Sequence, residues 1–212
     1  MFPYSYICIE GNIGSGKTSL CQMIAREYDC KLILEQFAEN PFLPYFYKDP
    51  ERYAFPVELF FMTERHKQLQ GSLMNRDLFL DMTISDYFFP KTLLFARKTL
   101  GEEEYRLFQQ LHQILDASFP NPDFLVYLHR PLPVLLEHIK ERGRPYEQEI
   151  EAKYLQEIQD SYFEFFMGYT EYPILIIDLN ERDFISDEQV YKEIIGLLKK
   201  EYSPGVHRIS LV

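Results

Sequence analysis

A glycine-rich segment near the start of the chain has the residue types and spacing of a phosphate-binding loop. Residues 11–18 form a complete G-x-x-x-x-G-K-T pattern, directly after an apolar run and directly before a helical one. Glycines let backbone N–H groups turn toward a phosphate, and the N-terminus of the following helix adds partial positive charge. We expect Lys17 to reach the β- and γ-phosphates and Thr18 to offer its hydroxyl to Mg²⁺. The predicted phosphate-binding residues are Gly11, Asn12, Ile13, Gly14, Ser15, Gly16, Lys17, Thr18 and Ser19.

Two arginines flank Gly143 and are suited to stabilise a phosphoryl group during its transfer. Arg142 and Arg144 follow an apolar helical pattern, and guanidinium groups form strong hydrogen bonds with phosphate oxygens. A plain helix C-terminus, which favours cations and a glycine cap, is the alternative. The continuation through Glu147 favours a mobile lid around residues 142–148.

Short apolar runs alternate with longer helical patterns along the chain, and these elements must position the polar side chains. The predicted strands are residues 6–9, 31–34, 82–85, 124–128 and 174–177. Unbroken apolar strands separated by helices are typical of a parallel sheet that is covered on both faces. Because crossovers are right-handed, the carboxyl ends of these strands share the edge where ligands bind. We predict an α/β fold of three layers with about five strands, as one domain over residues 1–212.

Two local signals predict where helices begin. Ser186 and Gln189 form a capping-box pattern at the start of the last helix, which we expect to end at Lys199 and Lys200. Pro56 is expected early in a long helix, because its missing N–H would be unpaired there in any case.

The chain resembles the deoxynucleoside kinase family, in particular its bacterial deoxyadenosine and deoxyguanosine kinases, over nearly the whole length. The segments that carry the resemblance are 9–14, 34–35 with 40–43 and 46–47, 142–144 with 146–148, and Asp178 and Asn180 with Asp183 and Phe184. Four motifs in the right order are more specific than the phosphate loop alone. The resemblance implies a P-loop kinase fold with a helical lid, ATP as phosphoryl donor with Mg²⁺, and a homodimer.

The resemblance also assigns roles to single residues. Glu35 ends a strand at the ligand edge, and a kinase that acts on a hydroxyl needs a base there, so the resemblance implies that Glu35 takes the 5′-hydroxyl proton. A solvated acid at a strand end is the alternative. Glu147 is implied to accept a hydrogen bond from the sugar 3′-hydroxyl, and Asp183 and Phe184 to lie beside the adenine. Asp86 either helps to organise Mg²⁺ and its waters or is a structural carboxylate.

One position departs from the family pattern. Members have arginine and serine after the acidic residue, whereas Tyr87 and Phe88 follow Asp86 here, and a register through Asp81 also lacks the arginine. A fixed positive charge near the sugar or the phosphates is therefore missing, and either another residue supplies it or catalysis is weaker.

The base-binding side departs from the family as well. Members usually have a glutamine where this chain has Glu58, and an amide offers one donor and one acceptor, which suits adenine or cytosine. A carboxylate only accepts, which suits the N1–H and N2–H₂ groups of guanine. Arg65, seven residues on and on the same helical face, could donate to O6 or N7. A Glu58–Arg65 pair without ligand is the alternative. Phe89 or Tyr53 is the candidate for stacking on the base.

Composition excludes several classes of protein. A formal charge of -11, from 33 acidic and 22 basic residues, disfavours a nucleic-acid polymer or an anionic membrane as partner. No basic segment followed by an apolar one opens the chain, and no apolar run approaches the roughly 20 residues that span a bilayer. Cys8 and Cys21 lie in apolar patterns and are expected in the core. We expect a cytoplasmic enzyme.

The most consistent function is transfer of the ATP γ-phosphoryl group to the 5′-hydroxyl of a deoxynucleoside in nucleotide salvage, with a purine favoured. Two alternatives stay open. A nucleoside monophosphate kinase shares the loop and the lid, but its acceptor is a phosphate that needs a cationic pocket rather than a base. A non-catalytic nucleotide-binding relative is suggested by the missing arginine, although Lys17, Thr18 and the lid arginines are intact.

Overall fold

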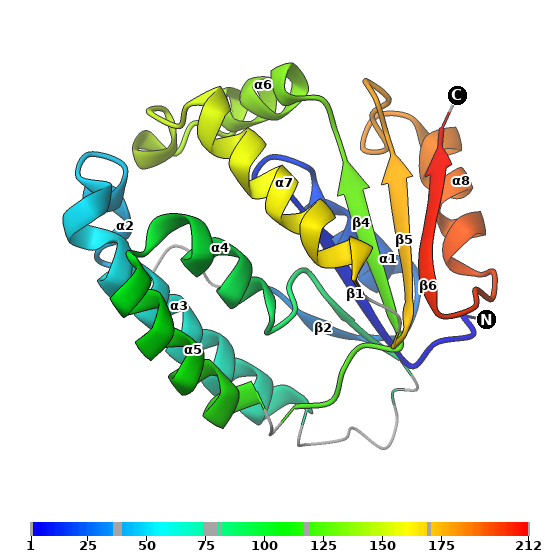
Figure 1. The fold of residues 1–212 in the computed structure, drawn as a ribbon. Coiled ribbons are helices and arrows are strands. Elements are labelled where there is room, and N and C mark those ends of the chain that lie inside the picture. Colours follow the sequence, from blue (N-terminus) through cyan, green and yellow to red (C-terminus); the bar gives the residue numbers. More distant parts are fainter. Residues whose placement is uncertain are drawn as a thin grey trace.

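A parallel sheet forms the centre of the molecule. The computed structural model describes residues 2–35, 40–73, 80, 82–116, 119–168 and 171–211. Within these residues six strands form one sheet in the order β2-β3-β1-β4-β5-β6, and all neighbouring strands are parallel (Figure 1). The strands are β1 (Tyr6–Gly11), β2 (Lys31–Ile33), β3 (Thr83–Ser85), β4 (Phe124–His129), β5 (Pro173–Asp178) and β6 (Gly205–Ser210).

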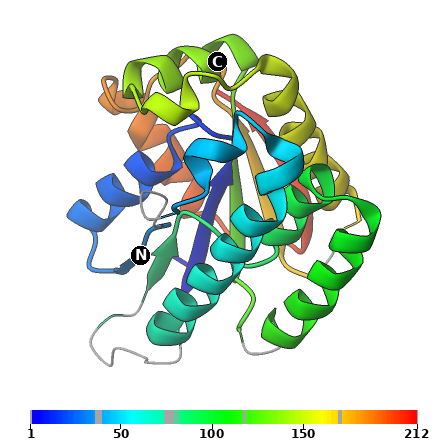
Figure 2. The same cartoon turned by 90° about the vertical axis from the view of Figure 1, so that its left-hand side faces the viewer.

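Helices cover both faces of the sheet and give three layers. They are α1 (Lys17–Glu27), α2 (Leu43–Phe46), α3 (Pro50–Leu73), α4 (Lys91–Thr99), α5 (Glu102–Asp116), α6 (Leu132–Arg142), α7 (Ala152–Met167) and α8 (Glu188–Leu198), with a 3₁₀ turn η1 (Pro145–Glu147). Successive strand residues face opposite sides. Ile7 and Ile9 therefore pack with α1 and α8, whereas Cys8 packs with α4 and α7. Helices α1 and α8 lie on one face of the sheet and α7 on the other (Figures 1 and 2).

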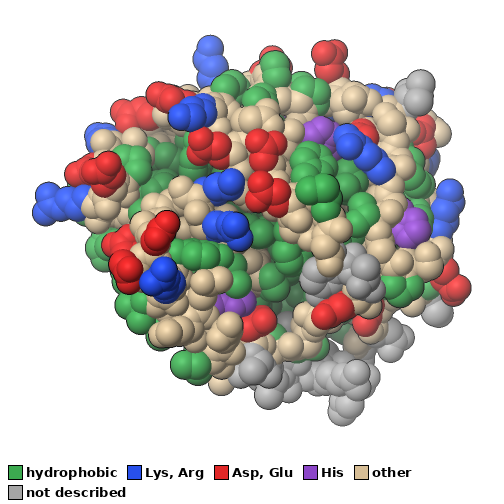
Figure 3. All heavy atoms as spheres, viewed as in Figure 1, with side chains coloured by type: hydrophobic (Ala, Val, Ile, Leu, Met, Phe, Trp, Pro, Cys, Tyr) green, Lys and Arg blue, Asp and Glu red, His purple; other side chains and the backbone are tan. Residues whose placement is uncertain are grey.

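A helical layer next to the short strands completes the fold. Helices α3, α4 and α5 contact one another through buried side chains that include Met62, Ala96 and Phe108. On the face seen in Figure 3, Lys and Arg side chains lie among Asp and Glu side chains and form no continuous basic area among the described residues. In the same part of the chain, no helix is both long and apolar enough to cross a membrane.

The predicted α/β fold with a parallel sheet is confirmed, with one additional strand. The five predicted strands correspond to β1 to β5, and β6 was not predicted because its residues alternate between half-buried and exposed at the edge of the sheet. Cys8 and Cys21 are buried as expected. The expectation for Pro56 was wrong, since α3 begins at Pro50 and contains Pro56 in its interior.

The predicted start of the last helix was displaced by one residue. Asp187, rather than Ser186, caps α8, because its carboxylate accepts hydrogen bonds from the backbone N–H groups of Gln189 and Val190. Ser186 instead donates its hydroxyl to Asp183 Oδ2 at 2.7 Å.

This cap predicts the effect of two neighbouring substitutions. Asp187→Ala leaves two N–H groups of α8 without their acceptor and should lower the free energy of unfolding by about 1 kcal/mol. Ser186→Ala removes no cap and should have a smaller effect. Urea unfolding followed by circular dichroism measures both, and a larger loss for Ser186→Ala would contradict the assignment.

Candidate active site

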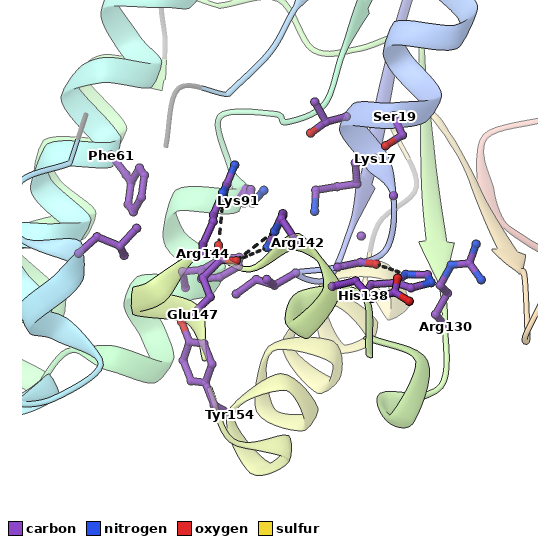
Figure 4. A pocket seen from close by; sticks show the side chains of 18 of the residues that line it. Lys17, Ser19, Phe61, Lys91, Arg130, His138, Arg142, Arg144, Glu147 and Tyr154 are labelled. Carbon is purple, nitrogen blue, oxygen red and sulfur yellow. Dashed lines mark hydrogen bonds and ion pairs between the residues drawn. The ribbon is translucent and has the colours of Figure 1, made fainter. Parts of the chain in front are cut away.

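A cavity of about 670 Å³ opens beyond the carboxyl ends of the central strands, where the topology places ligands (Figure 4). It extends from the loop after β1 to the helices α3 and α4. Among the sequence-predicted site residues, those that line it are Gly11, Ile13, Gly14, Gly16, Lys17, Thr18, Ser19, Glu58, Arg65, Arg142, Arg144, Glu147, Asp183 and Phe184. Asn12, Ser15, Glu35 and Asp86 are buried behind this lining.

The loop between β1 and α1 has the backbone that its glycines predict. Gly14 and Gly16 have φ angles of 81° and 94°, a left-handed conformation that side chains with a Cβ rarely adopt. A Cβ at Gly14 would also lie 2.7 Å from the Leu135 carbonyl oxygen. Asn12 holds the loop from behind, because its Nδ2 donates to the Leu155 carbonyl at 2.7 Å and its Oδ1 accepts from the N–H of Ile13.

Lys17 is the first residue of α1, and its ammonium group lies over the loop. Its Nζ donates to the Asn12 carbonyl at 2.8 Å. Burial, followed by the nearby charge of Lys91, lowers the pKa of Lys17 to about 8. A phosphate would therefore meet a desolvated cation together with the N–H groups of the loop, which is the chemistry of a nucleotide-binding site.

Thr18 and Asp86 bring two hard oxygen donors together beside this loop. The Thr18 hydroxyl donates to Asp86 Oδ2 at 2.5 Å, and Asp86 Oδ1 accepts from the backbone N–H of Glu35 at 2.7 Å. Burial raises the pKa of Asp86 above its usual range. A hydroxyl and a carboxylate next to a phosphate loop fit Mg²⁺, which binds one or two protein oxygens together with waters and phosphate oxygens. Asp81 lies outside the described residues.

Glu35 is buried between two cations. Arg65 Nε donates to Glu35 Oε1 at 2.6 Å, and Lys91 Nζ lies 3.2 Å from Glu35 Oε2. Burial alone would raise the pKa of Glu35, but Arg65 and then Lys91 lower it to about 2. The side chain is therefore an ionised carboxylate, only 2% exposed, with each oxygen held by a different helix.

The two predicted lid arginines converge on one carboxylate. Arg142 donates through Nε and Nη2 to Glu147 Oε2, at 3.0 and 2.6 Å, and Arg144 Nη1 donates to Glu147 Oε1 at 3.1 Å (Figure 4). Gly143, with φ of 69°, ends α6 between them, so the helix-cap geometry that we gave as the alternative is also present. Arg142, Arg144 and Glu147 also line the cavity, so they are placed to contact a ligand as well as to end the helix.

The side of the cavity next to the loop contains residues that the sequence analysis did not identify. Arg130, directly after β4, is 2% exposed, donates to the carbonyl oxygens of Ser15 and Asn180, and lies 5.7 Å from the ring centre of Phe184. His138 on α6 lies with Nδ1 2.8 Å from the Gly14 carbonyl oxygen. An isolated arginine or histidine carries little signal in a sequence, because only the fold shows what it contacts.

The opposite side of the cavity is aromatic and contains the buried acid Glu58. Phe46, Tyr47, Phe61, Phe95 and Tyr154 line it together with Glu58, whose Oε1 accepts a hydrogen bond from the Thr99 hydroxyl at 3.0 Å. Burial raises the pKa of Glu58 to about 7, although Arg65 and Thr99 act to lower it.

The structure bears on two expectations for this side. Glu58 and Arg65 both line the cavity from α3, as their spacing predicts, but Arg65 pairs with Glu35 and Thr92, so the Glu58–Arg65 pair that we gave as the alternative is not the arrangement found. Neither Phe89 nor Tyr53 lines the cavity, and Phe89 stacks on His112 in the helical layer.

Comparisons with known proteins agree with this geometry. A family model described as deoxynucleoside kinase matches residues 7–202. The chain belongs to the deoxynucleoside kinase family. It is 32% identical over 202 residues to a deoxyguanosine kinase of Bacillus subtilis, covering 92% of this chain and 96% of that protein. It is 31% identical over 208 residues to a deoxyguanosine kinase of Lactobacillus acidophilus, covering 92% and 91%.

Solved structures of the family have the same fold. A deoxyadenosine kinase from M. mycoides with bound dATP matches with a TM-score of 0.78 at 21% identity, covering 93% of this chain and 100% of that one. The same kinase with bound dCTP matches with a TM-score of 0.74. The chain is thus an enzyme of the phosphotransferase class with a P-loop kinase fold, and membership in the deoxynucleoside kinases does not favour the two alternative functions.

The strained glycine of the loop predicts a loss of nucleotide binding. Gly14→Ala places a methyl group 2.7 Å from the Leu135 carbonyl oxygen at a φ of 81°, so the loop must shift and its N–H groups turn away from the phosphates, and we expect ATP affinity to fall by about tenfold or more. Gly101→Ala, where a Cβ meets nothing within 4 Å, is the matched control. Calorimetric titration with ATP compares them, and equal affinities would contradict the role of the loop.

Proposed function

We propose that the enzyme transfers the γ-phosphoryl group of ATP to the 5′-hydroxyl of a purine deoxynucleoside, with guanine favoured, as a step of nucleotide salvage. The observation that carries this proposal is the cavity itself. One side of the cavity is the phosphate loop, and the other is aromatic and contains Glu58. The buried carboxylate of Glu35 lies behind the cavity lining, between Arg65 and Lys91.

The charges on the acceptor side favour a hydroxyl over a phosphate as acceptor. A second phosphate would need unpaired cations, but Arg65 and Lys91 are already paired with Glu35, and Lys91 also lies 3.5 Å from Glu10. The added Glu58 carboxylate disfavours an anionic acceptor further. A neutral nucleoside with a flat base suits the aromatic lining better.

The residues of the site divide the chemistry between them. Glu35 takes the proton of the 5′-hydroxyl while the hydroxyl oxygen bonds to the γ-phosphorus. The bond between the γ-phosphorus and the β–γ bridging oxygen breaks, and ADP is released. Lys17 binds the β- and γ-phosphates, while Arg142 and Arg144 stabilise the charge of the transferring group. The anionic triphosphate weakens the effect of the cations on Glu35, which raises its pKa above about 2 and makes it a better base.

Thr18 and Asp86 would hold Mg²⁺. The Thr18 hydroxyl would bind the ion directly, and the Asp86 carboxylate would bind either the ion or the water molecules coordinated to it. When bound, the ion neutralises charge on the phosphate oxygens. Asp183 and Phe184 would lie beside the adenine of ATP, and Glu147 would accept a hydrogen bond from the sugar 3′-hydroxyl.

The family resemblance also supports an assembly and a location. We propose that residues 1–212 act as one domain with a lid around residues 142–148, that two chains form a homodimer, and that the enzyme is cytoplasmic. Light scattering of the purified protein tests the dimer.

Replacing the proposed base tests the acceptor chemistry. Glu35→Gln has nearly the same shape but cannot take a proton, so kcat should fall by about 10²- to 10⁴-fold while nucleoside affinity changes much less. Glu103→Gln, at an exposed position of α5, is the control for loss of one negative charge. Steady-state kinetics and a binding titration measure both quantities, and unchanged turnover in Glu35→Gln would reduce Glu35 to a structural carboxylate.

The protonation of Glu58 should decide which purine is preferred. Above its pKa the carboxylate offers two acceptors for the N1–H and N2–H₂ of guanine, and below it the neutral acid offers one donor and one acceptor, as an amide does for adenine. A hydrogen-bonding mismatch of this kind costs about 1–3 kcal/mol, or about tenfold in kcat/KM.

The ratio of kcat/KM for deoxyguanosine to that for deoxyadenosine should therefore rise about tenfold between pH 6 and pH 8. Glu58→Gln should favour deoxyadenosine and make the ratio independent of pH. The proposal for Glu58 fails if the parent enzyme prefers deoxyadenosine throughout or if Glu58→Gln leaves the ranking unchanged.

A further inference from the structure

Lys91 is in an unusual position for a lysine. It is the first residue of α4 and is only 3% exposed, although lysine is rarely buried and the N-terminus of a helix repels cations. Two carboxylates offset these unfavourable effects, because Lys91 Nζ lies 3.2 Å from Glu35 Oε2 and 3.5 Å from Glu10 Oε2.

Lys91 lies between the proposed general base and the lysine of the phosphate loop. The Lys91 ammonium lies against Glu35, the proposed general base. Lys91 and Lys17 line the same cavity, and the charge of Lys91 helps to lower the pKa of Lys17 (Figure 4). On the far side of Glu35, Arg65 holds the other carboxylate oxygen. Two cations on two different helices thus fix the rotation of one carboxylate, and a carboxylate with about four lone-pair sites can still accept a further proton or hydrogen bond.

We propose that Lys91 is a positioning residue for phosphoryl transfer, and that it supplies from α4 the fixed positive charge that is missing after Asp86. Its ion pair with Oε2 holds the Glu35 carboxylate in the orientation that the transfer requires. This role rests on the proposed function of Glu35 as the base.

The competing explanation is that Lys91 only neutralises Glu10. Glu10 has other partners, since its oxygens accept hydrogen bonds from the backbone N–H groups of Gly11 and Phe88 and from the hydroxyl of Tyr162 at 2.8 Å. Lys91 Nζ, in turn, donates a hydrogen bond to Glu35 Oε2 at 3.2 Å. Lys91 is therefore placed to act on Glu35 and not on Glu10 alone.

The charged and titratable groups around Glu35 and Lys91 come from every element packed against them. They are Glu10 on β1, Lys17 on α1, Glu58 and Arg65 on α3, Asp86 and Tyr87 after β3, and Tyr162 on α7. Removing the positive charge at Lys91 would leave these acids in excess and Glu35 Oε2 without the ion pair that holds it.

The test compares Lys91→Met, Lys91→Arg and the control Lys98→Met, at an exposed position of the same helix. We expect Lys91→Met to lower kcat by about tenfold to a hundredfold with little change in nucleoside KM, since displacing a reacting group by about 1 Å has effects of this size. Lys91→Arg keeps the charge, and its kcat should be at least about fivefold above that of Lys91→Met. If Lys91→Arg were as slow as Lys91→Met, the positive charge would not be what the site requires, and the proposal would fail.

A double variant separates the two explanations and remains informative if Lys91→Met folds poorly. Glu10→Gln combined with Lys91→Met removes one charge of each sign and should recover the melting temperature. We expect its kcat to stay low with little change in nucleoside KM, because Glu35 Oε2 still lacks Lys91. Recovery of kcat to within about threefold of Glu10→Gln alone would show that Lys91 is only the counter-ion of Glu10.

The proposal and the function on which it rests fail in different ways. If Glu35→Gln is slow but the double variant is as fast as Glu10→Gln, only the role of Lys91 is overturned. If Glu35→Gln is as fast as the parent, the assignment of the base is overturned, and the role of Lys91 with it.

Discussion

Buried charges of both signs meet beneath the cavity, and the geometry of the site depends on their pairing. Among the described residues these are Glu10, Glu35 and Asp86 with Lys17, Arg65 and Lys91. Leaving one buried charge without its partner costs about 3–5 kcal/mol, so the elements that carry them must dock in one arrangement. Strand β1 and helices α1, α3 and α4 are held by this constraint as well as by their apolar faces. The same pairing places a carboxylate, an ammonium and a phosphate loop within one cavity.

The charge cluster also explains how two acids in one site acquire different properties. Burial favours the neutral form of both Glu35 and Glu58, but two adjacent cations keep Glu35 ionised, with a pKa of about 2. Glu58 lies among aromatic side chains and accepts a hydrogen bond from Thr99, and its pKa rises to about 7. In the proposed reaction, Glu35 would stay charged beside the acceptor hydroxyl, and Glu58 would change protonation near neutral pH beside the nucleobase.

Features that depend on local sequence could be predicted, and features that depend on distant partners could not. The loop from Gly11 to Thr18 follows from its spacing, and β1 to β5 follow from apolar runs. Strand β6 has too few buried residues to show such a run, because it pairs only along one edge. Lys91 gave no signal beyond being a cation at a helix start, since its partners lie 56 and 81 positions away in the chain. Helix spacing predicts that Arg65 lies on the same face as Glu58, and both line the cavity, but spacing does not show that Glu35 binds Arg65 from another element.

The central claim is that this cavity transfers a phosphoryl group to the 5′-hydroxyl of a deoxynucleoside. Its most direct test is ATP turnover with deoxyguanosine, deoxyadenosine and deoxycytidine, and with their 5′-monophosphates, in the presence of Mg²⁺, with the products assigned by phosphorus NMR. The account predicts conversion of deoxynucleosides to 5′-monophosphates and little or no reaction of the monophosphates. Turnover with the monophosphates alone, or with none of these acceptors, would contradict it.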